Sequence, residues 1–175
     1  SDLAQNVLDA GTVPLLVLCI QEPEITLKRI SASAMSDVCK HTPELAQAVV
    51  DAGAVAYLSP LIMHPDSKLK RQQESRQRVI IKTFSKSRPT NRPQVCCCLG
   101  QIAKHSVDLA EVVVEAEVFP NILKCLRDSD LYVRKNAATC IREIAKHTPE
   151  LAKLIVNSGG AAALVDYVAD AQASK

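Results

Sequence analysis

The stretch Lys146-His147-Thr148-Pro149-Glu150-Leu151-Ala152 decides the fold, because the same seven residues also stand at 40–46. A looser copy occupies residues 104–110, and Ser1-Asp2-Leu3-Ala4 matches the end of a fourth. Each copy predicts the end of one helix and the start of the next. Lys and His suit the negative end of a helix dipole, Thr148 suits an N-cap, and Pro149 and Glu150 suit a first turn. Junctions that recur at a fixed period are typical of a repeat array.

The spacing between the copies gives the length of the unit. Leu3 and Leu45 are 42 residues apart, as are Leu109 and Leu151, whereas Leu45 and Leu109 are 64 residues apart. The second unit therefore carries 22 additional residues. We predict units at 1–42, 43–106 and 107–148, and an incomplete unit at 149–175. Since the last unit is incomplete, we expect a piece of a longer array that self-associates through unfinished repeat ends.

Each unit divides into three helical segments. In the third unit, apolar residues recur at helical spacing in residues 108–116, 119–126 and 131–146. Asp130 is placed to cap the third of these segments. Gly11 and Gly53 mark the bend between the first and second segments of the first two units. Glu117 stands at this position in the third unit, so we expect a less sharp bend there.

This pattern resembles the armadillo repeat. Residues 43–54 carry the resemblance, together with the apolar helix that follows, Pro65-Asp66 and an amphipathic third helix. The HEAT repeat is the alternative, but three segments per unit and the Gly after the first favour armadillo. The resemblance covers the whole chain except residues 72–93. It implies an all-α, right-handed superhelical solenoid whose third helices line a concave groove.

Residues 1–70 and 101–170 resemble, more narrowly, the armadillo-repeat proteins of the central apparatus in motile cilia and sperm tails. The repeated seven-residue linker and Asn136-Ala137-Ala138-Thr139 carry this resemblance. It implies a non-enzymatic scaffold of the axoneme that associates with axonemal proteins and microtubules, supports motility and needs no cofactor. The alternative is a soluble transport or signalling adaptor that binds peptide partners in its groove.

Two sets of residues are candidates for partner binding. Each full unit starts its third helix with a basic pair, and stacking would place these pairs in a row that acidic tubulin tails could bind. A solvated helix face is the alternative. The pairs are Lys28-Arg29, Lys70-Arg71 and Arg134-Lys135.

The second set of candidates occupies the positions where nuclear-import armadillo proteins present Trp and Asn. It consists of Ser33 and Asp37, Cys97 and Gln101, and Thr139 and Glu143. The absence of Trp and Asn there disfavours a receptor for nuclear localisation signals.

Residues 72–93 interrupt the third helix of the second unit. They hold six Lys or Arg and one Glu, and Pro89 and Pro93 are expected to break a helix, so the helix should resume near Val95. We interpret the segment as a solvated loop, with an added site for an acidic partner as the alternative.

Outside residues 72–93, the chain is close to −3 in net charge. Together with 3% aromatic residues, this argues against nucleic-acid binding.

The sequence offers no constellation for metal, cofactor or catalytic chemistry. The seven Cys lack the spacing of a disulfide framework and are interpreted as core residues in a reducing compartment. His41, His105 and His147 recur once per unit, and stacking at about 10 Å would hold them too far apart for one metal. They are interpreted as helix-end structure. No signal peptide or membrane span is visible, and we expect no enzyme, no small-molecule substrate and no membrane association.

Overall fold

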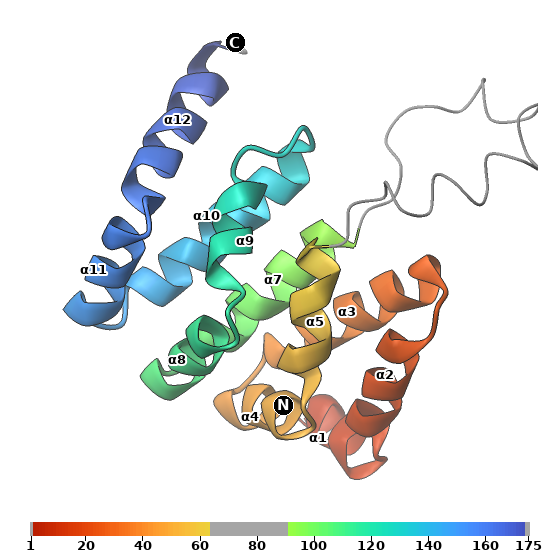
Figure 1. Cartoon of the computed structure of the whole chain (residues 1–175). Coiled ribbons are helices and arrows are strands. Elements are labelled where there is room, and N and C mark those ends of the chain that lie inside the picture. Colours follow the sequence, from red (N-terminus) through yellow and green to blue (C-terminus); the bar gives the residue numbers. More distant parts are fainter. Residues whose placement is uncertain (1, 64–90, 174–175) are drawn as a thin grey trace, which may run out of the picture.

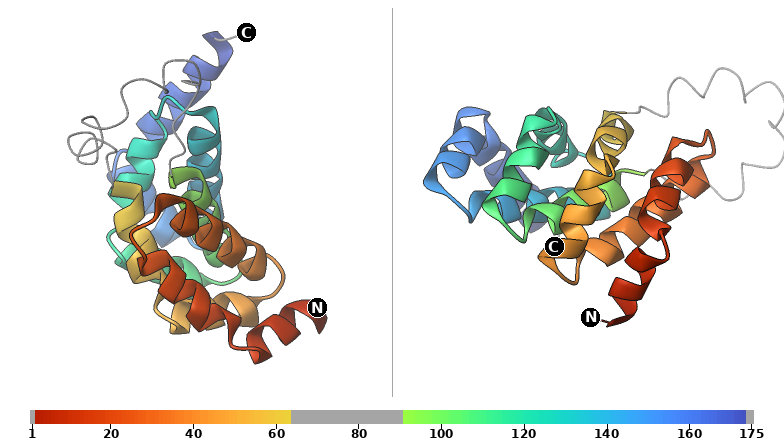
Figure 2. Two further views of the ribbon diagram at one scale, coloured as in Figure 1. Left: turned by 90° about the vertical axis from the view of Figure 1, so that its right-hand side faces the viewer. Right: turned by 90° about the horizontal axis from the view of Figure 1, so that it is seen from below.

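The computed structural model describes residues 2–63 and 91–173, with side chains for 5–62 and 91–169. Every regular element in these two stretches is a helix. The helices stack in chain order, so that each unit lies beside the next (Figure 1), and two further views show that the stack is curved (Figure 2). The chain is therefore an all-α repeat solenoid.

None of the described helices is alone long and apolar enough to span a membrane. Two pairs of helices reach the required length and apolar character only when both members are counted together, across bends of 82° and 74°.

The helices follow the predicted three-segment pattern. The first unit contains α1 (Asp2–Asp9), α2 (Thr12–Gln21) and α3 (Ile25–Cys39). The second contains α4 (Pro43–Asp51), α5 (Ala54–Met63) and α7 (Arg92–Ala103). The third contains α8 (Val107–Glu115), α9 (Phe119–Cys125) and α10 (Leu131–Ala145), and α11 (Pro149–Asn157) and α12 (Gly160–Ala173) follow.

The repeated junction has the predicted N-caps. The side chains of Thr42, Ser106 and Thr148 each accept a hydrogen bond from the backbone N–H three residues ahead, at 3.3, 3.1 and 3.2 Å. Asp130 caps α10 in the same way, through the N–H of Tyr132. Each such cap contributes about 1 kcal/mol to helix stability. The Lys of each junction is a C-cap rather than a member of the last turn, and the His follows outside the helix.

The bend between the first and second helices is left-handed in all four units. Gly11, Gly53 and Gly159 have φ of 69°, 75° and 80°, and Glu117 has φ of 54°. Glu117 therefore adopts the left-handed conformation of the three glycines, and the less sharp bend stays a prediction. Val118 and Phe119, which follow it, are buried against neighbouring helices. Their burial holds the bend in a conformation that costs a non-glycine residue about 1–2 kcal/mol.

The third helix of the second unit begins earlier than expected. It starts at Arg92 rather than near Val95, and Pro93 lies buried in its first turn. A proline in the first turn loses no helical hydrogen bond, because the N–H groups there have no partner within the helix. The prediction that Pro93 breaks the helix is therefore wrong. Lys70, Arg71 and the insertion up to residue 90 lie outside the described residues.

The helix α7 lies at the centre of the core and packs against both α3 and α10. Its side chains Val95, Leu99 and Ile102 are fully buried. At Gly100 an added Cβ would lie 3.3 Å from the Cα of Cys140, so the glycine permits a close approach of α7 to α10. The prediction that cysteines serve as core residues is confirmed for five of the seven, Cys39, Cys96, Cys98, Cys125 and Cys140, and none of the seven is in a disulfide.

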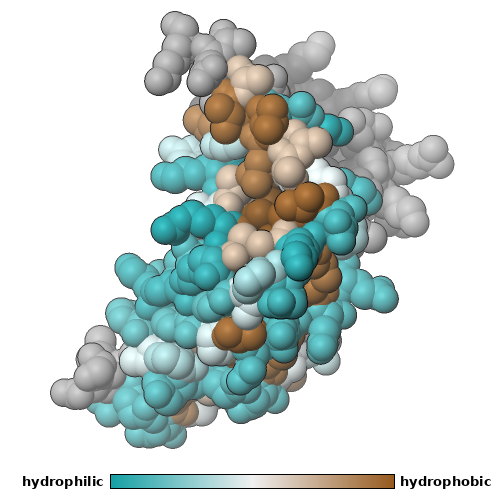
Figure 3. Space-filling model, turned by 90° about the vertical axis from the view of Figure 1, so that its left-hand side faces the viewer, coloured by the Kyte–Doolittle hydropathy of each residue, from teal (hydrophilic) through white to brown (hydrophobic). Residues whose placement is uncertain are grey.

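The α11–α12 end of the stack exposes apolar side chains. Val168 is 51% exposed, whereas its equivalents Ile62 and Leu126 are 3% and 1% exposed. In the earlier units a third helix follows and packs on the pair, and here the described residues contain only α11 and α12. Figure 3 shows the resulting hydrophobic stripe on this side of the molecule. The exposed large apolar residues of α11 and α12 are Leu154, Val156, Val165 and Val168.

Candidate functional site

The three third helices end at equivalent positions, and this fixes their register. Counting back from the last residues, Cys39, Ala103 and Ala145, aligns α3, α7 and α10 position by position. One row then consists of Ser33, Cys97 and Thr139, a second of Asp37, Gln101 and Glu143, and a third of Lys40, Lys104 and Lys146. Equivalent positions on stacked repeats form rows across a common surface.

Four of the predicted groove residues line one hollow between α7 and α10. The volume of the hollow is about 60 Å³, and its lining consists of Cys96, Cys97, Gly100, Gln101, Lys104, Asn136, Thr139 and Glu143. A space of this size holds a few water molecules or the end of one side chain. Ser33 and Asp37 are exposed on α3 and are not part of this lining.

The polar groups around the hollow differ in their hydrogen bonding. Glu143 is 8% exposed, and its carboxylate accepts from Arg142 at 2.6 Å and from Lys146 at 2.5 Å. The Oε1 atom of Gln101 is buried and has no hydrogen-bond partner in the described part of the chain. An unpaired buried acceptor is costly. Gln101 therefore retains an unused acceptor beside the hollow.

The predicted basic pairs differ from one another in exposure. Lys28, Arg29 and Arg134 are half-buried, and Lys135 is exposed. Lys70-Arg71 lies outside the described residues. In the register of the third helices, Arg92 takes the position held by Lys28 and Arg134. Its guanidinium is paired with Asp128 at 2.5 Å, so this cation is already neutralised within the fold.

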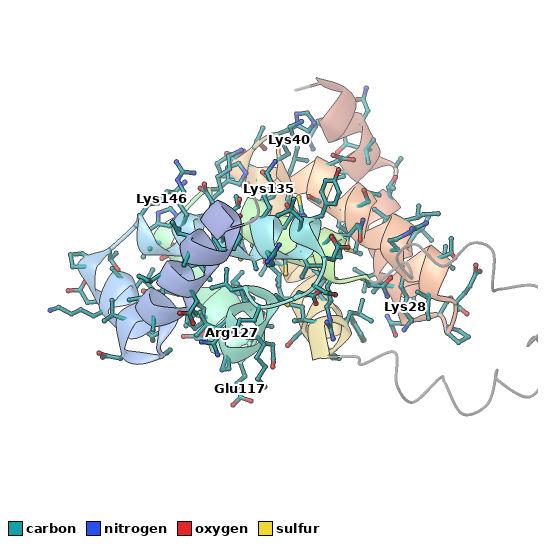
Figure 4. All side chains as sticks on the ribbon, turned by 90° about the horizontal axis from the view of Figure 1, so that it is seen from above. Lys28, Lys40, Glu117, Arg127, Lys135 and Lys146 are labelled. Carbon is teal, nitrogen blue, oxygen red and sulfur yellow. The ribbon has the colours of Figure 1, made fainter. Side chains whose placement is uncertain are left out.

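A row of lysines at the ends of the third helices was not predicted as a binding feature. Lys40 and Lys146 are exposed, and Lys104 is half-buried and donates through Nζ to the Lys40 carbonyl at 3.1 Å. Figure 4 places Lys40, Lys135 and Lys146 along one edge of the molecule, with Glu117 and Arg127 along the opposite edge. The signal for this row is the repeated Lys-His dipeptide, for which a match to the helix dipole is only one of two roles.

Formal charge is separated between the third helices and the other helices. With their C-capping lysines, α3 and α7 carry +2 each and α10 carries +3, which makes +7. The remaining described helices carry −8 together, with −2 on each of α1, α4 and α12, −3 on α8 and +1 on α9. The third helices with their C-caps are therefore positive as a set, and they stay positive at 7 − 2 = +5 when the N-caps Glu24 and Asp130 are counted, although the whole chain has a net charge of only +2.

In the second and third units, the His of the Lys-His dipeptide links the unit to the one before it. His105 Nε2 lies 2.6 Å from the carbonyl oxygen of Cys39, and His147 Nε2 lies 2.6 Å from that of Ala103. A carbonyl only accepts, so each of these ring nitrogens carries the proton. The rings satisfy carbonyls at the ends of α3 and α7, which supports the helix-end interpretation. No three His, Cys, Asp or Glu side chains within 5–62 and 91–169 lie together as metal ligands.

Comparisons with known proteins agree with this fold. The HEAT repeat family profile matches residues 118–148. The comparison with curated proteins gives no match. A solved structure of an engineered protein is 21% identical, with a TM-score of 0.79, over 95% of this chain and 60% of that one. A designed armadillo repeat protein in complex with peptide (KR)4 is 18% identical, with a TM-score of 0.77, over 94% of this chain and 60% of that one.

A natural protein also shares the architecture. The armadillo repeats only protein from Plasmodium falciparum is 14% identical, with a TM-score of 0.65, over 93% of this chain and 65% of that one. The chain thus spans about 60% of the length of the engineered and designed structures that it matches. At these identities the likeness establishes an armadillo- or HEAT-type repeat fold.

Proposed function

We propose that the chain is a non-enzymatic scaffold whose third helices hold an extended, acidic segment of a partner protein. The observation that carries this proposal is the separation of charge, +7 on the third helices against −8 on the other described helices. Complementary charge steers a partner to one face and selects against partners of the wrong sign. Equivalent positions at regular intervals suit an extended segment better than a compact one.

The rows of the third helices have separate roles in this proposal. Lys40 and Lys135 are exposed cations on one edge of the molecule and attract carboxylates, and Lys146, on the same edge, is exposed but paired with Glu143 (Figure 4). Gln101 Oε1, buried without a partner in the described residues, accepts from an N–H of the bound backbone. Glu143 is engaged by two cations of its own helix and C-cap. It therefore repels an acidic segment less than an unpaired carboxylate would.

The narrower proposal concerns the partner and the place. We propose that the acidic segment is a tubulin tail and that the scaffold belongs to the central apparatus of motile cilia and sperm flagella, where it supports motility. The repeated linker, Asn136-Ala137-Ala138-Thr139 and the basic surface support this. A soluble transport or signalling adaptor is the alternative, and it would use the same groove for a different peptide.

A peptide-binding titration tests the scaffold. Fluorescence anisotropy would compare a labelled poly-Glu peptide with (KR)4, the peptide bound by the designed armadillo neighbour, at low and high salt. Replacing Lys40, Lys135 and Lys146 by Gln should weaken poly-Glu binding about tenfold, or about 1.4 kcal/mol. The matched control replaces Lys124, Arg127 and Lys153, which are exposed outside the third helices, and should have a much smaller effect. Tighter binding of (KR)4, or equal losses in both triple variants, would overturn the acidic-segment proposal.

Co-sedimentation with microtubules tests the narrower proposal separately. The chain should pellet with intact microtubules at low salt and stay in solution when the acidic tails have been removed by limited proteolysis. If poly-Glu binds in the groove but microtubules do not pellet the chain, the axonemal assignment is wrong and the scaffold proposal stands.

A further inference from the structure

The hydrogen-bond donors and acceptors around the α7–α10 hollow are used unequally. Thr139 donates from Oγ to the Lys135 carbonyl at 3.0 Å, and Asn136 donates from Nδ2 to the Pro93 carbonyl at 2.9 Å. The buried Oε1 atom of Gln101 has no donor within the described residues. Two of the polar side chains that line the hollow thus direct a donor at the chain's own backbone, while an acceptor beside them is unused.

A group that reaches this acceptor must fit a small space. The hollow has a volume of about 60 Å³. Since a water molecule occupies about 30 Å³ in the liquid, there is room for about two non-hydrogen atoms. The Cβ and Oγ atoms of a serine side chain match this number, whereas the side chains of Asp and Glu exceed it. The carboxylate of Glu143, which lines the hollow and is 8% exposed, also disfavours a second carboxylate there.

The lining suits a group that both donates and accepts. Lys104 lines the hollow, and its Nζ donates to the Lys40 carbonyl at 3.1 Å. An ammonium has three donors, so Lys104 keeps others for a second acceptor. A hydroxyl can donate to Gln101 Oε1 and accept from Lys104 Nζ. A methyl group can do neither, and it would take water away from Gln101 Oε1 without replacing the hydrogen bond.

The preceding junction, between α3 and α7, contains a serine hydroxyl of the chain itself. Ser36 is 7% exposed and donates from Oγ to the sulfur of Cys97 at 3.2 Å. In the register of the third helices, Ser36 corresponds to Gly100, because each lies three residues before the end of its helix. Gly100 lines the hollow and has no side chain. The α7–α10 junction therefore lacks the hydroxyl that the chain supplies one unit earlier.

We propose that the hollow binds a serine side chain of the acidic partner segment, an inference that rests on the proposed function of the groove. The serine hydroxyl donates to Gln101 Oε1 and accepts from Lys104 Nζ. A carbonyl oxygen has two lone pairs, so Gln101 accepts from this hydroxyl in addition to a backbone N–H. The exposed Lys40 and Lys135 attract the acidic residues that flank the serine. The groove thereby selects one residue of the segment as well as its charge.

Phosphorylation of this serine separates the hollow from attraction by charge alone. A phosphate adds negative charge, which by itself would tighten binding to positive helices. It also adds a phosphorus and three oxygens to the hydroxyl oxygen and replaces the proton that Gln101 accepts. The enlarged group does not fit a volume of about 60 Å³. A phosphoserine should therefore bind more weakly than serine, although it is more acidic.

Fluorescence anisotropy with the full chain tests the preference. The labelled peptides carry one central residue, Ser, Ala, Val or phosphoserine, between two runs of Glu. The Ser peptide should bind about tenfold more tightly than the Ala and Val peptides, because only serine satisfies the buried acceptor. The phosphoserine peptide should bind severalfold more weakly than the Ser peptide at the same salt concentration.

The same titration distinguishes failure of this inference from failure of the proposed function. Equal binding of the Ser and Ala peptides, or phosphoserine binding as tightly as Ser, would overturn the serine site and leave the acidic-segment proposal in place. If none of the Glu-rich peptides binds, the acidic-segment proposal is wrong and the serine site is wrong with it.

A substitution of Gln101 assigns the preference to the hollow. Gln101→Leu removes the acceptor, so the ratio of the Kd of the Ala peptide to that of the Ser peptide should fall from about ten to about one. The matched control is Gln47→Leu, at an exposed glutamine of α4 that donates to Asp51 at 2.8 Å, and it should keep the ratio. An unchanged ratio in Gln101→Leu would overturn the assignment. If this variant fails to fold, the wild-type comparison of the Ser, Ala and phosphoserine peptides still decides the proposal.

Discussion

Replacing His147 by alanine should weaken the contact between the second and third units. Its ring donates from Nε2 to the carbonyl of Ala103 at 2.6 Å and is half-buried. Removing it takes away a hydrogen bond with a net contribution of about 0.5–1.5 kcal/mol and leaves the carbonyl at the end of α7 less satisfied. We therefore expect a loss of about 1–2 kcal/mol. For a chain of this length, that lowers the Tm by about 2–8 °C.

The first unit supplies the matched control. His41 stands at the same position of the repeat, but its side chain is exposed and no earlier unit precedes it in the described chain. His41→Ala should change stability by less than about 0.5 kcal/mol. Thermal and urea unfolding, followed by circular dichroism, would measure both variants. His147→Gln should recover part of the loss, because the Gln amide can also donate. Equal losses in the two alanine variants would refute the role of the inter-unit hydrogen bond.

Three further predictions follow from backbone geometry and exposure. Glu117→Gly should stabilise the chain by about 1 kcal/mol in urea unfolding, since the bend has a φ of 54° that glycine adopts without strain. Gly100→Val should destabilise it by about 1–3 kcal/mol in the same assay, because a Cβ there lies 3.3 Å from the Cα of Cys140. Val165 and Val168 are 68% and 51% exposed, so replacing both by Ser should reduce concentration-dependent self-association in light scattering; unchanged association would place the contact elsewhere.

The local parts of the fold were predictable from sequence. The N-caps at Thr42, Ser106, Thr148 and Asp130 depend on a side chain and a backbone N–H two or three residues away, and residue identity decides such contacts. The helical segments were predictable from the spacing of apolar residues, which is also a property of the local sequence. Three-helix units could therefore be assigned without any knowledge of how the units pack.

The sequence was a poorer guide at Glu117 and Pro93. Glu117 is an unfavourable residue for a left-handed bend, yet α8 and α9 impose that conformation. Pro93 was expected to end a helix, but it lies in the first turn of one and is buried. Proline suits the first turn of a helix as well as its end, so Pro93 by itself is consistent with both assignments.

The residues of the candidate groove were predictable from sequence, but their hydrogen bonding and ion pairing were not. Its residues were identified from the repeat, and Cys97, Gln101, Thr139 and Glu143 do line one hollow. Their chemical states could not be predicted, because they depend on neighbours in other units and on the chain's own cations. Glu143 is neutralised by Arg142 and Lys146, while Gln101 retains a buried acceptor without a described partner.

The net charge of the chain conceals how charge is distributed among its helices. A value of +2 over 175 residues indicates no preference for partner charge. Among the described helices, the third helices with their C-caps carry +7 and the others carry −8, and the remaining charged residues lie in loops, at N-caps or outside the described residues. The lysine of each Lys-His dipeptide contributes to this division because the repeat returns it to one row. The lysine that caps each third helix therefore also adds positive charge to this set of helices.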